Sequence, residues 1–284
     1  MCSSDLIAQL QSGDLDLAFR VPPNEFDNLS KVATLNVVAS PNPGIFRIVF
    51  DTTISPWDKK EVRQAFYYAI NRQAICDSVF KGRCHVLINH PGFKVYDDEN
   101  KYEYNVDKAK QLLQAGGYTN QHFRLIFDQT FPNSGSIMPL IQADLQKAGV
   151  TVDLTPLDTA TYGTTFTKRG AWDGGIAIGG SEALSPQKTQ QYYKPAPDGT
   201  KFQSGYTNPD IFTLWAQGLS TTDPAAQDAA YHKLALILNT DVPMINLYAD
   251  DLVQVYKKTL GGGFKVHLNE RETFMNVETW TLGS

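Results

Sequence analysis

The stretch DTTISPWDKKEVRQAFYYAINRQAICDSVFKG, residues 51–82, carries the strongest helix pattern in the chain. Asp58 occupies an N-cap position, and Glu61 follows three residues later, as in a capping box. Trp57 before the cap and Val62 after it are spaced to form a hydrophobic staple. The pattern therefore predicts a helix that begins at Asp58.

The same helix has one apolar face, because large apolar residues recur at steps of three and four. These residues are Val62, Phe66, Ala69, Ile70 and Val79. Gly82 supplies a left-handed C-cap, and the strand-like run 46–50 precedes the stretch. We therefore expect a strand, a turn and one long buried helix over residues 58–80.

Composition limits the class of protein. The chain has 284 residues, 42% of them hydrophobic, and a formal net charge of -5. This length allows one large α/β domain or two small ones, and the mild acidity argues against a nucleic-acid partner. No stretch approaches the roughly 20 apolar residues of a membrane-spanning helix. The start, MCSSDLIAQL, lacks the pattern of a signal peptide, so we expect the leader of an exported protein to be absent from this chain.

Three cysteines leave one without a partner within the chain. Cys76 and Cys84 flank the end of the long helix, and the Gly82 turn could bring them together in an oxidising compartment. Two unpaired small hydrophobic residues are an equally good interpretation. Cys2 lies near the terminus and is expected to be free.

The rest of the chain alternates helices and strands. A short helix over residues 4–12 ends at Gly13, and Asn105 caps a helix that ends at Gly116. A strand at 123–127, a helix at 136–149 and a strand at 150–154 predict a parallel crossover.

Further along, we expect a helix over 159–168, a buried strand at 173–179 and an irregular segment over 180–207. Long irregular segments within a domain are usually functional. Asn208 and Asp223, each followed by proline, should cap two helices. Two strands are expected after them, at 242–248 and 252–256.

The sequence shows no constellation of catalytic or metal-binding residues. It contains no phosphate loop, and the run GGSEA around Ser181 lacks the second glycine of a nucleophile elbow. The spacing of Cys84, His85 and His90 matches no zinc pattern, and the acidic run 97–99 lacks the alternation of a calcium loop. We therefore predict a protein that is not an enzyme, with no cofactor and no metal.

Four segments resemble a known family in the right order. They are VRQAFYYAINRQAI, YNVDKAKQLLQAGGY, IQADLQKAGVTVDL and YTNPDIFTLWAQGLSTTDPAAQDAAYHKLALILNTDVPMINLY. Together they are similar to the extracellular solute-binding proteins that deliver oligopeptides, dipeptides and nickel chelates to ABC importers. The resemblance implies the α/β fold class, specifically the C-terminal lobe of a type II periplasmic-binding-protein fold, with a mixed sheet flanked by helices.

The resemblance also implies a domain plan. A fifth segment, LIAQLQSGDLDLAF, precedes these four and resembles the passage near the end of the family's first lobe, so the usual first lobe has no counterpart upstream. Residues 1–50 are then a remnant of the first lobe and hinge, 51–249 the C-terminal ligand-binding lobe, and 250–284 a return to the hinge or first lobe. The two terminal segments should lie adjacent.

A binder of this family closes two lobes around a solute and presents it to permease subunits at the membrane. The resemblance implies that the loop after GGIAIGG faces the ligand, with Glu182 in place of the acid that pairs with a peptide ammonium group, one residue out of step. The candidate ligand-binding residues are Asp51, Tyr162, Gly180, Ser181, Glu182, Tyr192 and Tyr206. Peptide is the family's usual ligand, while a Gly-, Ser- and Tyr-rich loop suits an oligosaccharide equally well.

The implied partners are a small solute, the ABC permease and the missing N-terminal lobe, with no nucleic acid and a monomeric state. The implied location is extracellular or periplasmic, with the full-length protein secreted or anchored to the membrane. A truncated lobe without independent ligand binding is the alternative function.

Overall fold

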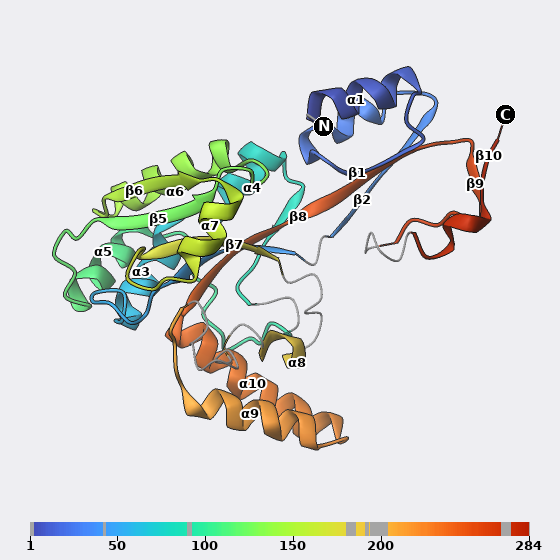
Figure 1. Cartoon of the computed structure of the whole chain (residues 1–284). Coiled ribbons are helices and arrows are strands. Elements are labelled where there is room, and N and C mark those ends of the chain that lie inside the picture. The colour runs from blue at the N-terminus through green and yellow to red at the C-terminus, as the bar shows by residue number, and fades with distance from the viewer. Residues whose placement is uncertain are drawn as a thin grey trace. The chain divides into compact units, whose positions relative to one another are not determined.

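The structure is a computed structural model, and it describes residues 3–41, 44–89, 93–179, 186–190, 193, 204–267 and 274–283. The chain divides into two compact units (Figure 1). Unit 1 comprises Met1–Asn42, Cys76–His85 and Ala249–Ser284, and unit 2 comprises Pro43–Ile75 and Val86–Tyr248. The predicted boundaries 1–50, 51–249 and 250–284 remain a prediction about lobes, and they did not place residues 76–85 with the terminal segments.

Unit 1 is built from both ends of the chain. Its elements are α1 (Ser3–Ser12), β1 (Leu17–Val21), η1 (Pro23–Glu25), α2 (Phe26–Leu29), β2 (Leu35–Pro41), most of β8 (Met244–Lys257), β9 (Leu260–Gly262), η3 (Phe274–Thr279) and β10 (Trp280–Leu282). Both β1 and β2 pair antiparallel with β8, so strands from the two terminal segments lie side by side as predicted. A core that includes Leu10, Leu29 and Val253 joins α1 and α2 to this sheet.

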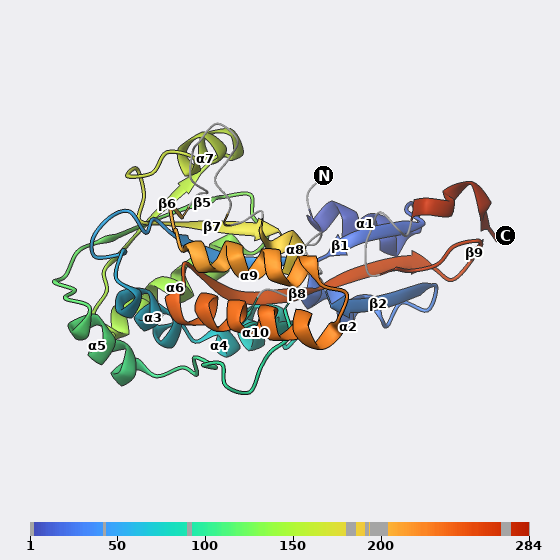
Figure 2. The same ribbon diagram turned by 90° about the horizontal axis from the view of Figure 1, so that it is seen from below.

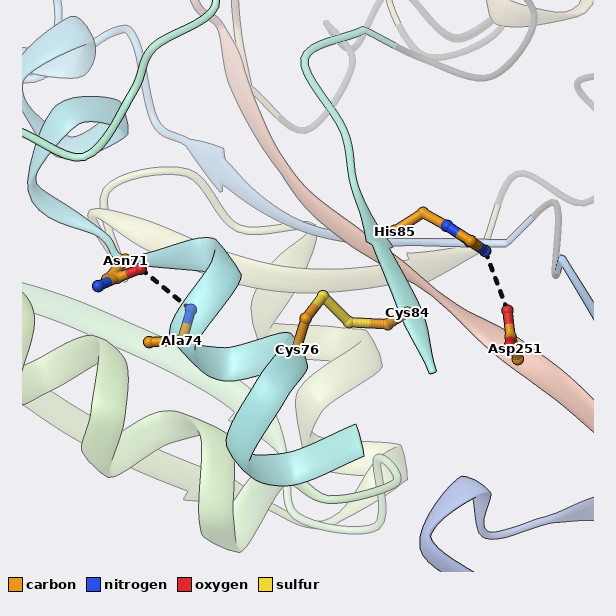
Figure 3. The surroundings of a disulfide bond; sticks show 6 residues. All are labelled: Asn71, Ala74, Cys76, Cys84, His85 and Asp251. Atoms are coloured by element: carbon orange, nitrogen blue, oxygen red, sulfur yellow. Dashed lines mark hydrogen bonds and ion pairs between the residues drawn. A yellow bond between two sulfur atoms is a disulfide. The ribbon is translucent and has the colours of Figure 1, made fainter. Parts of the chain in front are cut away.

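Residues 76–85, which belong to unit 1, contain a disulfide. Cys76 on α4 (Arg72–Phe80) is bonded to Cys84 at the start of β4 (Cys84–Val86), which decides between the two alternatives left by the sequence (Figure 3). The amide of Asp251 donates to the Arg83 carbonyl at 3.0 Å, and the Asp251 carboxylate pairs with His85 at 3.1 Å. These contacts hold the segment against the later part of β8.

Unit 2 contains a mixed sheet. Its strands are β3 (Ile45–Phe50), β5 (Phe123–Asp128), β6 (Val152–Leu157), β7 (Gly174–Gly179) and the beginning of β8. The order is β8-β3-β7-β5-β6, with β3 antiparallel to its two neighbours and β5 parallel to both β6 and β7. Gly174 and Gly175 begin β7 because a Cβ there would come within 2.2 Å of Phe123 and 2.3 Å of Phe166.

The helices of unit 2 follow the predicted pattern in most places. They are α3 (Lys60–Ala69), α5 (Val106–Ala115), α6 (Ser134–Lys147), α7 (Thr159–Phe166), α8 (Pro186–Thr189), α9 (Pro209–Ser220) and α10 (Pro224–Asp241). Asn105, Asn208 and Asp223 each accept a hydrogen bond from the first turn of their helices, which confirms the predicted caps. α9 and α10 lie side by side (Figure 2).

The single helix expected over residues 58–80 is wrong, because the structure has two helices, α3 and α4. Ile70 between them is extended (φ -87, ψ 118) and buried. The break places Arg72 over the Tyr67 ring and lets its guanidinium donate to the carbonyls of Leu87 and Tyr102. These contacts come from residues distant in sequence and override the helical periodicity.

The predicted start of α3 also needs correction. The N-cap is Lys59 rather than Asp58, no side chain caps it, and Asp58 instead pairs with Lys59 at 3.0 Å. Trp57 is buried as expected, with its ring edge-on to Phe66 and Phe123. The two strands expected over 242–256 form one strand, β8, whose first part pairs with β3 at residues 244–248 and whose later part pairs with β2 at residues 251–257.

Candidate functional site

The carboxyl ends of three parallel strands meet at one edge of the unit 2 sheet. β5 ends at Asp128, β6 at Leu157 and β7 at Gly179, and the register sets Asp128 opposite Leu157. We call this the carboxyl edge. In open α/β sheets, ligands bind outside the carboxyl ends of the strands, so this edge is the candidate site.

A buried carboxylate orients hydroxyl groups at the carboxyl edge. Asp128 is 2% exposed and accepts hydrogen bonds from the amide and hydroxyl of Thr130 at 2.8 and 2.7 Å. The hydroxyls of Thr130 and Thr159 lie 3.3 Å apart, and both residues are exposed. Burial raises the pKa of Asp128, but the hydrogen bonds from Thr130 and Thr159 outweigh burial and lower it overall. Asp128 therefore stays ionised and holds the two hydroxyls in place.

α7 begins directly at this edge. Asp158 caps it by accepting hydrogen bonds from the amides of Ala160 and Thr161. Tyr162 on this helix is 8% exposed, and its hydroxyl donates to the Ile176 carbonyl. Its ring lies edge-on to half-buried Phe131, with 5.5 Å between centroids. Tyr162 thus lies at the carboxyl edge, where it supports Phe131 and where burial raises the pKa of its hydroxyl.

Arg47 is a residue that the sequence prediction missed. It lies in β3, opposite Ala177 in β7, and is only 2% exposed. A guanidinium buried within a sheet must be hydrogen-bonded or paired. The single arginine inside the apolar run IFRIVF could have indicated this residue from the sequence, because a charged side chain within a buried strand is unusual.

Asp51 lies at the opposite end of the sheet, where β7 begins. Its amide donates to the Asp173 carbonyl, and its side chain is fully buried. One carboxylate oxygen accepts from the amide and hydroxyl of Thr53, and the other accepts from the Gly170 amide at 2.8 Å. Both oxygens are therefore used within the chain.

Tyr206 lies near this second end too. Its hydroxyl donates to Asp241 at 2.6 Å, and burial together with this hydrogen bond raises its pKa. Tyr206 lines a pocket of about 410 Å³, and Thr52 and Arg63 line it too. We call this region, with Asp51, Tyr206 and the pocket, the distal end.

Arg63 is the second residue that the sequence prediction missed. It is 3% exposed, and it donates to the carbonyls of Trp57 at 2.7 Å and of Asp241 and Val242. Burial lowers its pKa, although an arginine keeps its charge in proteins. Arg63 therefore fastens the beginning of α3 to the end of α10.

Four predicted ligand residues, Gly180, Ser181, Glu182 and Tyr192, lie outside the described residues. β7 ends at Gly179, so the chain leaves the carboxyl edge into this loop. Of the predicted set, the structure places Tyr162 at the carboxyl edge and Asp51 and Tyr206 at the distal end.

The described residues contain no group of three or more side chains that could hold a metal ion. Within that part of the chain, no helix combines the length and the apolar character needed to cross a bilayer. Glu99 of the acidic run 97–99 accepts hydrogen bonds from the Asn89 side chain and from the Tyr96 amide. His90 lies outside the described residues.

The family described as bacterial extracellular solute-binding proteins, family 5 Middle, matches residues 3–200. Glutathione-binding protein GsiB of Escherichia coli K12 is 26% identical over 268 residues, which are 90% of this chain and 52% of GsiB. GsiB of Salmonella typhimurium is 27% identical over the same lengths.

Solved structures show the same fold. The substrate-binding protein CtaP of an ABC transporter from Listeria monocytogenes superposes with a TM-score of 0.85 at 21% identity, covering 99% of this chain and 58% of CtaP. The oligopeptide-binding protein AppA of Bacillus subtilis, in complex with a nonapeptide, gives 0.84 at 22% identity and covers 99% of this chain and 59% of AppA.

These comparisons confirm the predicted family and the solute-binding-protein fold. The prediction of a binder rather than an enzyme is confirmed at the level of the family, because the matched family consists of solute-binding proteins. The chain spans about half the length of the curated relatives it matches.

Proposed function

Because the chain belongs to the bacterial extracellular solute-binding proteins of family 5, we propose that it is one lobe of the solute-binding component of an ABC importer. It would contribute the carboxyl edge to a site that a second lobe closes over a peptide or a similar small solute. The bound solute would then be presented to permease subunits by a monomeric protein outside the cytoplasmic membrane.

The single observation that supports this proposal is the arrangement at the carboxyl edge. Thr130 and Thr159 are exposed, are adjacent and are held by a buried carboxylate, and Phe131 lies next to them. Hydroxyl groups beside an aromatic ring suit a ligand with polar backbone groups and apolar side chains. A peptide has both, and relatives are named for glutathione and for oligopeptides.

The predicted residues would then have different roles. Gly180, Ser181 and Glu182 would continue the site beyond Gly179, with Glu182 facing a ligand ammonium group. Tyr192 would extend the same loop. Tyr162 would act beneath Phe131, whereas Asp51 and Tyr206 would act through the rigidity of the distal end.

Two alternatives belong to the same family. An oligosaccharide would use the same hydroxyls and the tyrosines of the loop. A lobe acting alone would bind no ligand with measurable affinity. One lobe supplies about half of the contacts, while the ligand still loses its translational freedom. For the isolated chain we expect no binding tighter than ~100 µM.

An NMR titration tests the proposal even at weak affinity. Three ligands would be added separately at millimolar concentration to the 15N-labelled chain. They are glutathione, a second peptide of three residues and an oligosaccharide of the maltose series. We expect the peptides to shift the amides of Thr130, Phe131 and Thr159. Thr159→Val should weaken these shifts, while Thr151→Val, at an exposed threonine away from the edge, should leave them unchanged.

Shifts confined to the distal end would contradict the proposed site. Larger shifts with the oligosaccharide than with either peptide would favour the alternative ligand. Submicromolar binding by the chain alone would show that a complete pocket exists without a second lobe.

A further inference from the structure

The face of the unit 2 sheet against which α7 packs has a notch near the start of β7. The strand register sets Val49 of β3 and Ile126 of β5 on either side of Gly175. Both neighbours are buried, and both belong to the same core cluster as Phe166 of α7. Residues opposite one another on adjacent strands share a face, so a row of two branched side chains has no side chain at its middle position. We call this place the Gly175 notch.

Phe166 fills the Gly175 notch. A Cβ on Gly175 would lie 2.3 Å from the Phe166 ring, whereas ordinary van der Waals contact begins at 3.4 Å. A residue larger than glycine therefore does not fit beneath the ring where it lies. Phe166 is 5% exposed and is the last residue of α7. The notch thus fixes the position of this end of the helix against the sheet.

A second contact holds the middle of α7. The Tyr162 hydroxyl donates to the carbonyl of Ile176 in β7. Tyr162 and Phe166 are four residues apart and lie on one face of the helix, and their rings stack with 5.1 Å between centroids. The ring of buried Trp172 also lies 5.1 Å from that of Phe166. α7 is therefore held to β7 at two points.

The other end of α7 carries one of the hydroxyls of the carboxyl edge. Thr159 is the first residue of the helix, and its hydroxyl lies 3.3 Å from that of Thr130. Since a helix rises 1.5 Å per residue, Thr159 lies about 10 Å along the axis from Phe166. The separation of the two hydroxyls is already long for a hydrogen bond between them, so an outward shift of about 1 Å would break their contact.

We propose that Gly175 and Phe166 are positioning residues of the ligand site. The notch receives the Phe166 ring, this contact sets the distance of α7 from the sheet, and that distance brings Thr159 to Thr130. Neither Gly175 nor Phe166 lies at the carboxyl edge, so both act through the helix. This inference rests on the proposed function, since it identifies what places one of the two hydroxyls that would face the ligand.

The neighbouring glycine provides a matched control. A Cβ on Gly174 would lie 2.2 Å from the Phe123 ring. Successive side chains of a strand point to opposite faces, so this clash falls on the face away from α7. Gly174→Ala should therefore disturb the core as Gly175→Ala does, but without moving α7. Gly163→Ala within α7 is a second control, because a Cβ there meets nothing within 4 Å.

An NOE between the side chains of Thr130 and Thr159 would report the position of α7 without any ligand. We expect Gly175→Ala to remove most of its intensity, because the Phe166 ring must move by about 1 Å to admit the methyl group. The two control variants should keep the NOE. An unchanged NOE in Gly175→Ala would overturn the proposal, and so would an equal loss in Gly174→Ala.

A double variant separates positioning from a general loss of stability. Phe166→Leu shortens the side chain that the new methyl group meets, so Gly175→Ala/Phe166→Leu should regain most of the NOE that Gly175→Ala loses. Residues in contact are expected to be non-additive in such a cycle. If Gly175→Ala does not fold, Phe166→Leu becomes the reference, and the double variant should show the stronger NOE because its alanine fills the notch. A double variant no better than its reference would overturn the proposal.

Titration with glutathione at millimolar concentration connects the position of α7 to binding. We expect Gly175→Ala to bind at least about threefold more weakly than the wild type, judged by the amide shifts of Thr130 and Thr159. Gly174→Ala should bind as the wild type does. A wild type that shows the NOE but no binding would refute the proposed function and leave the positioning of α7 supported. Unchanged binding in Gly175→Ala after loss of the NOE would refute this inference alone.

Discussion

The two ends of the unit 2 sheet use polar residues in opposite ways. At the distal end, Asp51, Arg63 and Tyr206 are bound to other parts of the chain. At the carboxyl edge, Thr130 and Thr159 are exposed, and the only role of their hydroxyls within the described chain is to contact each other and Asp128. The comparison teaches that a polar residue near a strand end can serve either the fold or a ligand, and that the exposure of the residue itself distinguishes the two.

The largest effect should come from Arg63 at the distal end. Arg63→Met leaves three backbone carbonyls without their buried donor. We expect a loss of about 4 kcal/mol in the free energy of unfolding, measured by urea denaturation. Lys60→Met, at an exposed residue of the same helix, is the control and should cost less than about 0.5 kcal/mol. Equal losses would show that Arg63 does not fasten the distal end.

Trp57→Ala should be nearly as damaging. The ring is 2% exposed and lies against Phe66 and Phe123, so its removal leaves a cavity. We expect a loss of about 3 kcal/mol, seen as a lower midpoint in thermal unfolding. A loss below about 0.5 kcal/mol would mean that the side chain is not part of the core.

Asp51→Asn tests whether this residue serves the fold. The amide keeps the shape of the side chain but replaces one acceptor oxygen with a donor that faces the Thr53 hydroxyl or the Gly170 amide. We expect a loss of about 2 kcal/mol in unfolding free energy. Unchanged stability together with altered ligand shifts in the NMR titration would instead assign Asp51 to the ligand.

Asp128→Asn tests the carboxyl edge through pH. The pKa of Asp128 is lowered in the folded chain, so its ionised form adds stability above the unfolded pKa, which is near 3.8. That contribution is lost as the pH falls through the lower folded value. The wild type should therefore exceed the variant in stability at pH 7, and the difference should shrink below about pH 4 in urea melts. A constant difference from pH 7 to pH 2 would show that no such linkage exists.

The smallest change in stability should come from Thr159→Val. Its hydroxyl is exposed, so we expect a change within about 0.5 kcal/mol by urea denaturation. The same variant should nevertheless weaken the ligand shifts of the NMR titration. A large loss of stability with unchanged ligand shifts would mean that Thr159 stabilises the fold, as the polar residues of the distal end do.

The sequence by itself determined most of the local structure. Asn105, Asn208 and Asp223 cap helices as predicted, because a cap involves only residues within one turn. Gly13 and Gly82 take positive φ at the helix ends where the sequence placed them. The mixed α/β architecture could also be predicted from the alternation of helices and strands. The family could be predicted because whole segments of the sequence resemble it.

The tertiary structure alone decided where helix periodicity fails and what each polar residue does. The break at Ile70 depends on the carbonyls of Leu87 and Tyr102, which only the fold brings to Arg72. Asp51 follows β3, and Tyr162 lies in the helix that follows β6. They lie at opposite ends of the sheet because β3 is antiparallel to β7, which runs parallel with β5 and β6. Contacts between residues far apart in the chain set these outcomes, and no local pattern of residues encodes them.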